Sequence, residues 1–398
     1  MSQARSKLWT KDFITISITN FFLYFVFYLL LVTMTVYVVE QFGASESTAG
    51  LATGIFIIGT LISRLFIGRI IHNIGNKKIL YIGLISFILT SLLYFIPLGI
   101  SFLLITRFLQ GLALGVASTA TGTIVADIIP IERKGEGISY YSMSITIATA
   151  IGPFIGIYLG QQTTYTMIFA LCASLAVVSL VIAFFIDVPE AKQTTTTSTK
   201  PSLKFSDFIE PKALPIAVII AILSLGYASV LSFINFYAIE INLVETASLF
   251  FVVYAIAILI SRPFTGRLMD IKGANAVMYP AFILFSGGLF LLSTASSSVI
   301  FLIAGALIGL GYGNIQSTTQ AIAIKVTSPE RVGLATSTYY IALDAGLGFG
   351  PYILGFLIPV SGYRYLYVIM GAMVFVTIIL YYLLHGKKKK AISYNIAK

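Results

Sequence analysis

The chain of 398 residues is 58% hydrophobic and only 10% charged, with a mean hydropathy of +0.96. In soluble domains about a quarter of all residues are charged. This composition therefore excludes an ordinary soluble enzyme, a disordered protein and a nucleic-acid-binding module. The net charge of +10 is therefore interpreted from where the basic residues lie, not as a sign of polyanion binding. A membrane-spanning helix needs about 20 apolar residues, so the chain has room for about eleven or twelve spans and little else.

Apolar segments separated by short polar stretches run along the whole chain. We expect them to be helices, because no alternating strand pattern is present and lipid offers no partner to free backbone groups. The first segment follows Arg5, Lys7 and Lys11 and is too long for the apolar core of a signal peptide, so it is predicted to be an uncleaved span. The twelve predicted spans are 13–39, 47–67, 77–96, 101–125, 137–159, 164–186, 214–238, 247–265, 276–294, 298–322, 333–358 and 364–384.

The basic residues predict how these spans are oriented. With a cytoplasmic N-terminus, all but Arg107 and Arg364 of the 25 basic residues fall on the cytoplasmic side, whereas Glu40 and Glu245 fall on the outer side. The positive-inside rule then predicts a multi-pass protein of the cell membrane with both termini in the cytoplasm. The run Lys387–Lys390 gives the C-terminus a basic cytoplasmic tail.

The second half of the chain repeats the first at a constant offset of 198 residues. Because each half has six predicted spans, both halves have the same orientation, which predicts two six-helix bundles related by a parallel pseudo-twofold repeat. The predicted domains are residues 1–190 and 213–398, joined by a cytoplasmic linker, 191–212, whose threonine- and proline-rich composition indicates flexibility. The matching pairs include Arg64 with Arg262, Gly111 with Gly309, Glu132 with Glu330, Tyr141 with Tyr339, and Gly152-Pro153 with Gly350-Pro351.

Three motifs resemble those of the major facilitator superfamily and, within it, of the 12-span drug:proton antiporters. Gly68–Lys78 is similar to the family's loop between spans 2 and 3, although His72 stands where the family has aspartate. Arg107–Gly111 is similar to the Arg-x-x-Gln-Gly element of span 4. Gly152–Gly156 resembles the Gly-Pro element of exporters, although Ile157 replaces its last glycine. The resemblance covers essentially the whole chain and implies secondary transport by alternating access.

The same motifs contain the features of a gate. Small residues four positions apart let helices approach closely, and proline permits a bend, so spans 5 and 11 are predicted to be gating helices. Charges at the cytoplasmic helix ends are predicted to latch the two halves in one conformation. Static helix packing and a solvated charged loop are the alternatives. The predicted gating residues are Gly68, Arg69, Gly75, Lys77, Asp127, Arg133, Gly152, Pro153, Gly156, Gly350 and Pro351.

Two ionisable residues qualify as lying deep inside a predicted span, where inserting a charge costs about 2.5–3.5 kcal/mol. Asp344 lies close to the middle of span 11 and is the predicted proton-coupling group, because a carboxylate that binds either a proton or a cationic substrate produces antiport. Arg107 lies closer to the outer side of span 4 and is predicted to modulate proton affinity. The alternatives are a carboxylate fixed for structure and an arginine that only packs helices.

Aromatic and amide side chains are predicted to line a substrate cavity. Rings with few formal charges suit lipophilic, often cationic compounds, whereas tyrosines at span ends also form the ordinary interfacial belt. The predicted cavity residues are Asn20, Tyr24, Tyr28, Tyr227, Asn235 and Asn314.

These patterns, together with the resemblance, predict multidrug-type efflux: proton-coupled export of small lipophilic or cationic compounds. Two alternatives stay open, a proton-coupled transporter of a sugar or amino-acid-like metabolite and a lipid translocase. No nucleophile–base pair, phosphate loop or metal-ligating cluster has the spacing of an enzyme, so neither a metal nor another cofactor is expected. The expected partners are the small-molecule substrate, protons and the lipid bilayer, with no nucleic acid, and the two fused halves predict a functional monomer.

Overall fold

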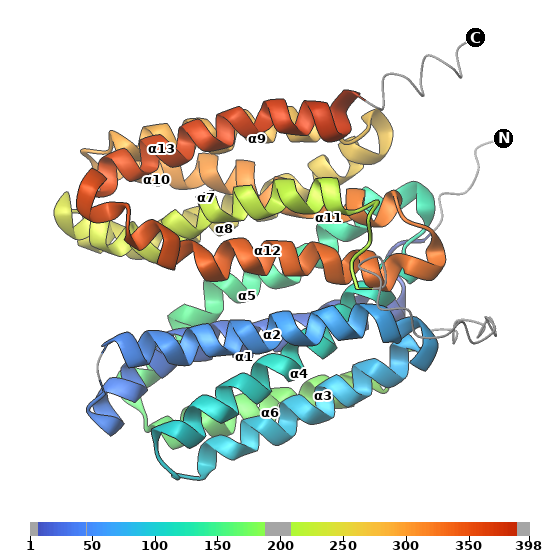
Figure 1. Cartoon of the computed structure of the whole chain (residues 1–398), viewed down its shortest axis with the longest axis vertical. Coiled ribbons are helices and arrows are strands. Elements are labelled where there is room, and N and C mark those ends of the chain that lie inside the picture. Colours follow the sequence, from blue (N-terminus) through green and yellow to red (C-terminus); the bar gives the residue numbers. More distant parts are fainter. Residues whose placement is uncertain (1–6, 45, 188–207, 388–398) are drawn as a thin grey trace. The chain divides into compact units, whose positions relative to one another are not determined.

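The computed structural model describes residues 7–44, 46–187 and 208–387, and within these ranges the chain forms helices and turns without strands. The helices of the first half are α1 (Lys11–Phe42), α2 (Glu46–Ile74), α3 (Asn76–Leu92), η1 (Leu93–Phe95), α4 (Ile100–Ile128), η2 (Ile131–Arg133), α5 (Lys134–Gln162) and α6 (Tyr165–Ala183) (Figure 1). Those of the second half are α7 (Leu214–Glu240), α8 (Val244–Lys272), α9 (Asn275–Ser293), α10 (Ser298–Ile308), η4 (Gly309–Gly313), α11 (Asn314–Lys325), η5 (Pro329–Arg331), α12 (Val332–Gly355), α13 (Ile358–Tyr381) and η6 (Tyr382–Gly386).

Eleven of the described helical segments are long and apolar enough to cross a membrane by length and composition. One of them, Ser298–Lys325, combines α10, the π-helical turn η4 and α11. The further long helix, α12, is not among these eleven; it carries Asp344 and several glycines. Counted in this way, the described residues form twelve long helices, and the all-α membrane fold predicted from the sequence is confirmed.

Two helices continue well beyond the ends that the sequence predicts. The predicted ends are residues 67 and 265, but α2 runs to Ile74 and α8 to Lys272. Each helix ends only at a glycine with positive φ, Gly75 at 102° and Gly273 at 84°, a backbone conformation that other residues avoid. Polar side chains before these glycines do not end the helix, because its backbone hydrogen bonds are internal. The segment from Gly68 to Ile74, expected in a loop, is therefore helical.

Glycines allow equivalent close contacts between helices in the two halves. A Cβ atom on Gly111 of α4 would clash with the backbone of Phe56 in α2, and one on Gly309 of η4 would lie 2.6 Å from the carbonyl oxygen of Tyr254 in α8. Phe56 and Tyr254 differ by the same 198 positions as the two glycines. The sequence repeat is thus a repeat of tight backbone contacts inside each half, as expected where small residues set helix spacing in lipid.

The described chain divides into two compact units that exchange short helix segments. Unit 1 contains Met1–Ile131, Ser144–Glu210 and Ser328–Tyr340, whereas unit 2 contains Glu132–Met143, Pro211–Thr327 and Ile341–Lys398. In unit 1, α4 packs against α2 and α3, and α1 packs against α6; in unit 2, α9 packs against α10 and α13 (Figure 1). The first part of α5 belongs to unit 2 and the first part of α12 to unit 1. Of the predicted linker 191–212, residues 191–207 lie outside the described residues.

We expect Gly111→Ala to lower the melting temperature of the purified protein. The added Cβ meets the backbone of Phe56, which cannot rotate away, and such overpacking costs about 1–3 kcal/mol. Gly160→Ala is the matched control, because a Cβ there meets nothing within 4 Å. Thermal unfolding in detergent, followed by size-exclusion chromatography, measures the difference. Equal melting temperatures for the two variants would contradict a tight α2–α4 contact.

Candidate functional site

Arg64 of α2 lies at the centre of a polar cluster in unit 1. The sequence analysis placed it among the cytoplasmic basic residues, but it is only 1% exposed. Its Nη2 donates to the hydroxyls of Tyr24 at 3.4 Å and Ser118 at 3.1 Å, and its guanidinium lies 4.6 Å from the ring centroid of Tyr340. A cation–π contact of this kind is strongest where water is excluded. The signal that could have identified Arg64 is its repeat partner Arg262, which is 0% exposed.

The predicted cavity residue Asn20 connects three helices of unit 1. Its Nδ2 donates to Ser144 Oγ of α5 at 2.9 Å, and its Oδ1 accepts a hydrogen bond from Thr121 Oγ1 of α4 at 3.0 Å. Tyr24 and the half-buried Tyr28 follow on the same helix, with ring centroids 6.4 Å apart. The structure therefore brings the three predicted α1 residues together along one stretch of the helix, with Asn20 bonded at both ends of its amide.

The predicted gating glycines lie in the close contact between α1 and α5. A Cβ on Gly152 would be 2.8 Å from Cβ of Tyr28, and one on Gly156 would be 2.9 Å from the carbonyl oxygen of Leu29. Pro153 lies inside α5 between them. Larger side chains at either glycine would therefore separate these two helices.

The equivalent glycine of unit 2 lies in the contact between α12 and α7. A Cβ on Gly350 would clash with the side chain of Ala228, and Pro351 follows inside α12. Asp344 lies earlier on α12, in the part that belongs to unit 2, and is half-buried.

Tyr227 is part of a buried stack of tyrosines in unit 2. Its ring centroid is 4.2 Å from that of Tyr312 and 5.4 Å from that of Tyr254, with interplanar angles of 14° and 18°. The hydroxyls of Tyr312 and Ser224 are 3.0 Å apart. Tyr312 lies on η4, and π-helical turns of this kind frequently occur at functional sites. The sequence analysis missed Tyr254, although it repeats the aromatic position of Phe56.

Asn314, next to this stack, bonds α11 to α8. Its Nδ2 donates to Ser261 Oγ at 2.9 Å and to the carbonyl oxygen of Leu310 at 2.7 Å, while its Oδ1 accepts from Thr265 Oγ1 at 2.7 Å. Asn235 lies in α7, and its side chain is outside the described part of the chain.

Arg107 is 0% exposed and binds residues of α2, η1 and α4. It donates to the carbonyl oxygen of Ala52 at 3.2 Å, to Tyr94 Oη at 3.3 Å and to Gln110 Oε1 at 3.0 Å. The Phe56 ring centroid is 4.5 Å from its guanidinium. These contacts fix the Arg107 side chain inside unit 1. The predicted effect of Arg107 on proton affinity would therefore have to act through this network.

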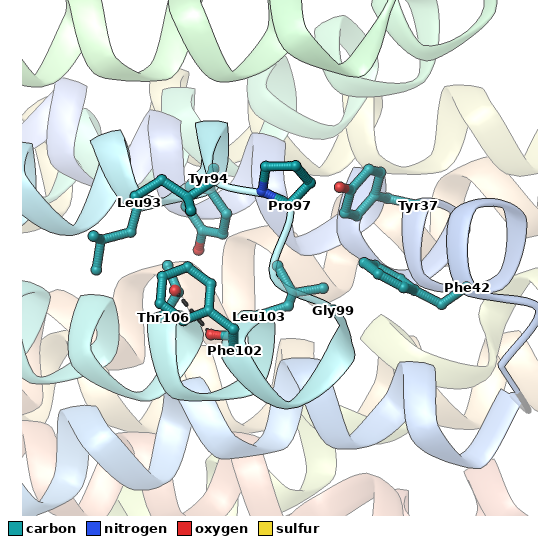
Figure 2. Close-up of a pocket in the computed structure, with 10 residues that line it drawn as sticks. Tyr37, Phe42, Leu93, Tyr94, Pro97, Gly99, Phe102, Leu103 and Thr106 are labelled. Atoms are coloured by element: carbon teal, nitrogen blue, oxygen red, sulfur yellow. Dashed lines mark hydrogen bonds between the residues drawn. The ribbon is translucent and has the colours of Figure 1, made fainter.

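A small hollow lies beside this network, at the turn between α3 and α4 (Figure 2). Its enclosed volume is about 10 Å³, and Tyr94, Pro97 and Thr106 are among the residues around it. Pockets for drug-sized ligands measure roughly 300–1,000 Å³, so this hollow is too small to be the cavity that the sequence analysis expected.

The charged residues expected in the latch bind different partners. Asp127 Oδ2 accepts from Asn76 Nδ2 at 2.7 Å in unit 1, and Arg133 donates to both carboxylate oxygens of Glu136, each at 2.9 Å, in unit 2. Gly75 ends α2, and Lys77 lies half-exposed in the first turn of α3. A Cβ on Gly68 would clash with Ser337, and the guanidinium of Arg69 lies 5.0 Å from the Phe208 ring centroid.

Comparison with known proteins adds independent observations. The model of the Major Facilitator Superfamily matches residues 16–244 and 243–396. The chain is 22% identical over 360 residues to the Staphylopine export protein of Staphylococcus aureus, covering 86% of this chain and 89% of the relative. It is 24% identical over 356 residues to Multidrug resistance protein 1 of Bacillus subtilis, covering 87% and 90%. The solved structure of the human organic anion transporter MFSD10 (TETRAN) has a TM-score of 0.75 at 14% identity over 93% of this chain and 98% of that one, which shows the shared fold.

We expect Arg107→Gln to destabilise the protein whether or not it transports. The substitution removes donors from Tyr94, Gln110 and the Ala52 carbonyl, and each unsatisfied buried group costs about 1–3 kcal/mol. Arg267→Gln is the control, because Arg267 is exposed on α8. Melting temperatures in detergent compare the two. If Arg107→Gln melts like Arg267→Gln, the network does not support the fold.

Proposed function

This chain belongs to the major facilitator superfamily of transporters, and we propose that it exports small lipophilic or cationic compounds in exchange for protons. The observation that carries the proposal is its likeness, over more than four-fifths of both chains, to two proteins named for staphylopine export and multidrug resistance. The proposal places the protein in the cell membrane as a monomer, with both termini in the cytoplasm.

The exchanged helix segments support alternating access. α5 passes from unit 2 to unit 1 after Met143, and α12 passes from unit 1 to unit 2 after Tyr340. Any displacement of one unit must therefore bend these helices or release the exchanged segments. Gly152-Pro153 and Gly350-Pro351 lie beyond the two crossing points, where proline removes a helix hydrogen bond and eases bending.

Asp344 supports proton coupling through its position. It lies in α12 four residues after the crossing point at Tyr340, and no other residue between Val332 and Gly355 carries a formal charge. A carboxylate at such a place is retained at a cost of about 2.5–3.5 kcal/mol, which favours a functional role. Because a proton and a cation neutralise the same carboxylate, binding of one excludes the other, and proton entry then drives export of the cation.

The tyrosine stack of unit 2 supports the substrate class. Tyr227, Tyr254 and Tyr312 form a stack of nearly parallel rings without a formal charge, and all three are buried. Aromatic faces bind flat lipophilic groups and attract cations, so the stack suits such a substrate once it is uncovered. This composition favours lipophilic or cationic compounds over strongly anionic ones, which require paired basic groups.

We expect lipophilic cations to collapse the proton gradient of everted membrane vesicles that contain the protein. The lumen is acidified, a pH-reporting dye follows the gradient, and lipophilic cations, neutral drugs, sugars and amino acids are added in turn. Asp344→Asn is expected to abolish the response because the side chain no longer binds a proton, whereas Asp344→Glu retains part of it. Asp187→Asn is the matched control, since Asp187 is exposed beyond the end of α6.

Two outcomes would contradict the proposal. An unchanged response in Asp344→Asn would exclude Asp344 as the coupling group while leaving antiport intact. A response to sugars or amino acids alone would replace the lipophilic substrate class with a polar metabolite.

A further inference from the structure

The short segment Phe208–Glu210, hereafter the strap, directly precedes α7 yet belongs to unit 1. Its Phe208 lies against two side chains of α2. The ring centroid of Phe66 is 6.1 Å away at an angle of 88°, and the guanidinium of Arg69 is 5.0 Å from the Phe208 centroid. An edge-to-face aromatic pair together with a cation over the ring gives Phe208 a specific seat on this helix.

Glu210, at the other end of the strap, binds the beginning of α12. Its carboxylate accepts a hydrogen bond from Arg331 Nε, and its backbone N–H donates to Thr338 Oγ1 at 2.9 Å. The Glu210 side chain is only 3% exposed, whereas that of Arg331 is 41% exposed. Removing the partner of a carboxylate so fully shielded from water is costly, so the contacts of Glu210 hold the strap firmly on this segment.

The first part of α12 also contacts α2 directly. Ser337 Oγ donates to the carbonyl oxygen of Arg64, and the guanidinium of Arg64 lies over the Tyr340 ring. Gly68 makes room for Ser337, because a Cβ there would clash with it. The strap therefore adds a bridge from α2 to α12 beside a contact that the two helices already make.

The equivalent positions of the other half are arranged differently. Arg133, the last residue of η2, corresponds to Arg331 and binds Glu136 at the start of α5. Asp12 corresponds to Glu210, and its Oδ1 accepts a hydrogen bond from the backbone N–H of Asp187 at 2.8 Å. The Glu210–Arg331 pair is thus a feature that the repeat does not require.

We propose that Glu210 is a positioning residue for transport: through Arg331 and Thr338, the strap holds the first part of α12 on α2, and this pair must open whenever α12 leaves unit 1. The inference rests on the alternating access proposed above. It adds a residue outside the spans that sets how readily the gating helix is released. Undocking exposes Glu210 to water, and its hydration offsets part of the cost of losing its partners.

The test uses a cysteine that reports the docking of α12. Thr336 is fully buried beside Gly122, and its hydroxyl has no hydrogen-bond partner among the described residues, so Thr336→Cys removes no bond. The native Cys172 is itself buried and gives a low background. We expect Glu210→Gln to accelerate labelling of Thr336→Cys by N-ethylmaleimide in membrane vesicles about tenfold, the size typical of coupling between contacting residues.

Glu330→Gln is the matched control, because it removes the same charge next to Arg331 at an exposed site. Hydrogen bonds from its own backbone and from Ser328 lower the pKa of Glu330, so it is ionised at neutral pH and the change of charge is equal. Labelling in this variant is expected to match the parent. Equal labelling in Glu210→Gln and Glu330→Gln would overturn the proposal.

The buried position of Glu210 also predicts the order of the variants. Arg331→Gln leaves a charged carboxylate without its ion-pair partner, so it should accelerate labelling more than Glu210→Gln does. The double variant should label more slowly than Arg331→Gln alone, because it carries no unpaired charge. Additive effects of the two substitutions would contradict a direct pair. A Glu210→Asp variant, expected to be intermediate, serves if Glu210→Gln folds poorly.

These measurements need neither a substrate nor a proton gradient. The strap can therefore be confirmed in a protein that fails the vesicle assay, and the vesicle assay can succeed with a strap that has no effect on labelling. Where export is measured, Glu210→Gln should change the maximal rate and leave KM unaltered, because Glu210 acts on the movement of α12 and not on the bound substrate.

Discussion

α5 and α12 each contribute residues to both compact units, and the proposals for a gate, for the strap and for a coupling group all start from this exchange. In unit 1 the first part of α12 lies against Gly68, and in unit 2 the first part of α5 lies against Gly266, where a Cβ would be 2.6 Å from Ser139 Oγ. A hydrogen-bonded helix bends only at defined weak points. Displacement of one unit would therefore require either that α5 and α12 bend or that their first parts leave these contacts.

The spans and the repeat could be predicted from the sequence because lipid leaves a chain few ways to satisfy its backbone. The helix ends could not, since α2 and α8 continue through polar residues until a glycine with positive φ. The positive-inside count likewise assigned Arg64 and Arg262, near the ends of predicted spans, to the cytoplasmic basic residues, although both are buried. Counting basic residues treats each one near a span end as hydrated, whereas the partners of Arg64 come from distant parts of the sequence.

The types of residue in the candidate site could be read from the sequence, but the groups that each side chain contacts could not. Asn20 was predicted as a cavity residue, but it is fully buried and both ends of its amide bind other helices, because rotation and depth of the helices decide which groups meet. Tyr227 was identified, but its neighbour Tyr254 was not. Only the register between α7 and α8 brings the two rings together. The assignment of proton coupling to Asp344 stays a prediction.

The repeat is symmetric in its glycines but not in its charges. Asp270 of α8 accepts the backbone N–H groups of Gly135 and Glu136, both at 2.8 Å, and pairs with Lys325 at 2.7 Å. This carboxylate satisfies and electrostatically stabilises the start of α5. The position equivalent to Asp270 in α2 is His72, which cannot offer a carboxylate to the start of α12. Glu210 reaches that segment instead, through the side chain of Arg331 in η5, so α5 and α12 are held at their starts by different chemistry.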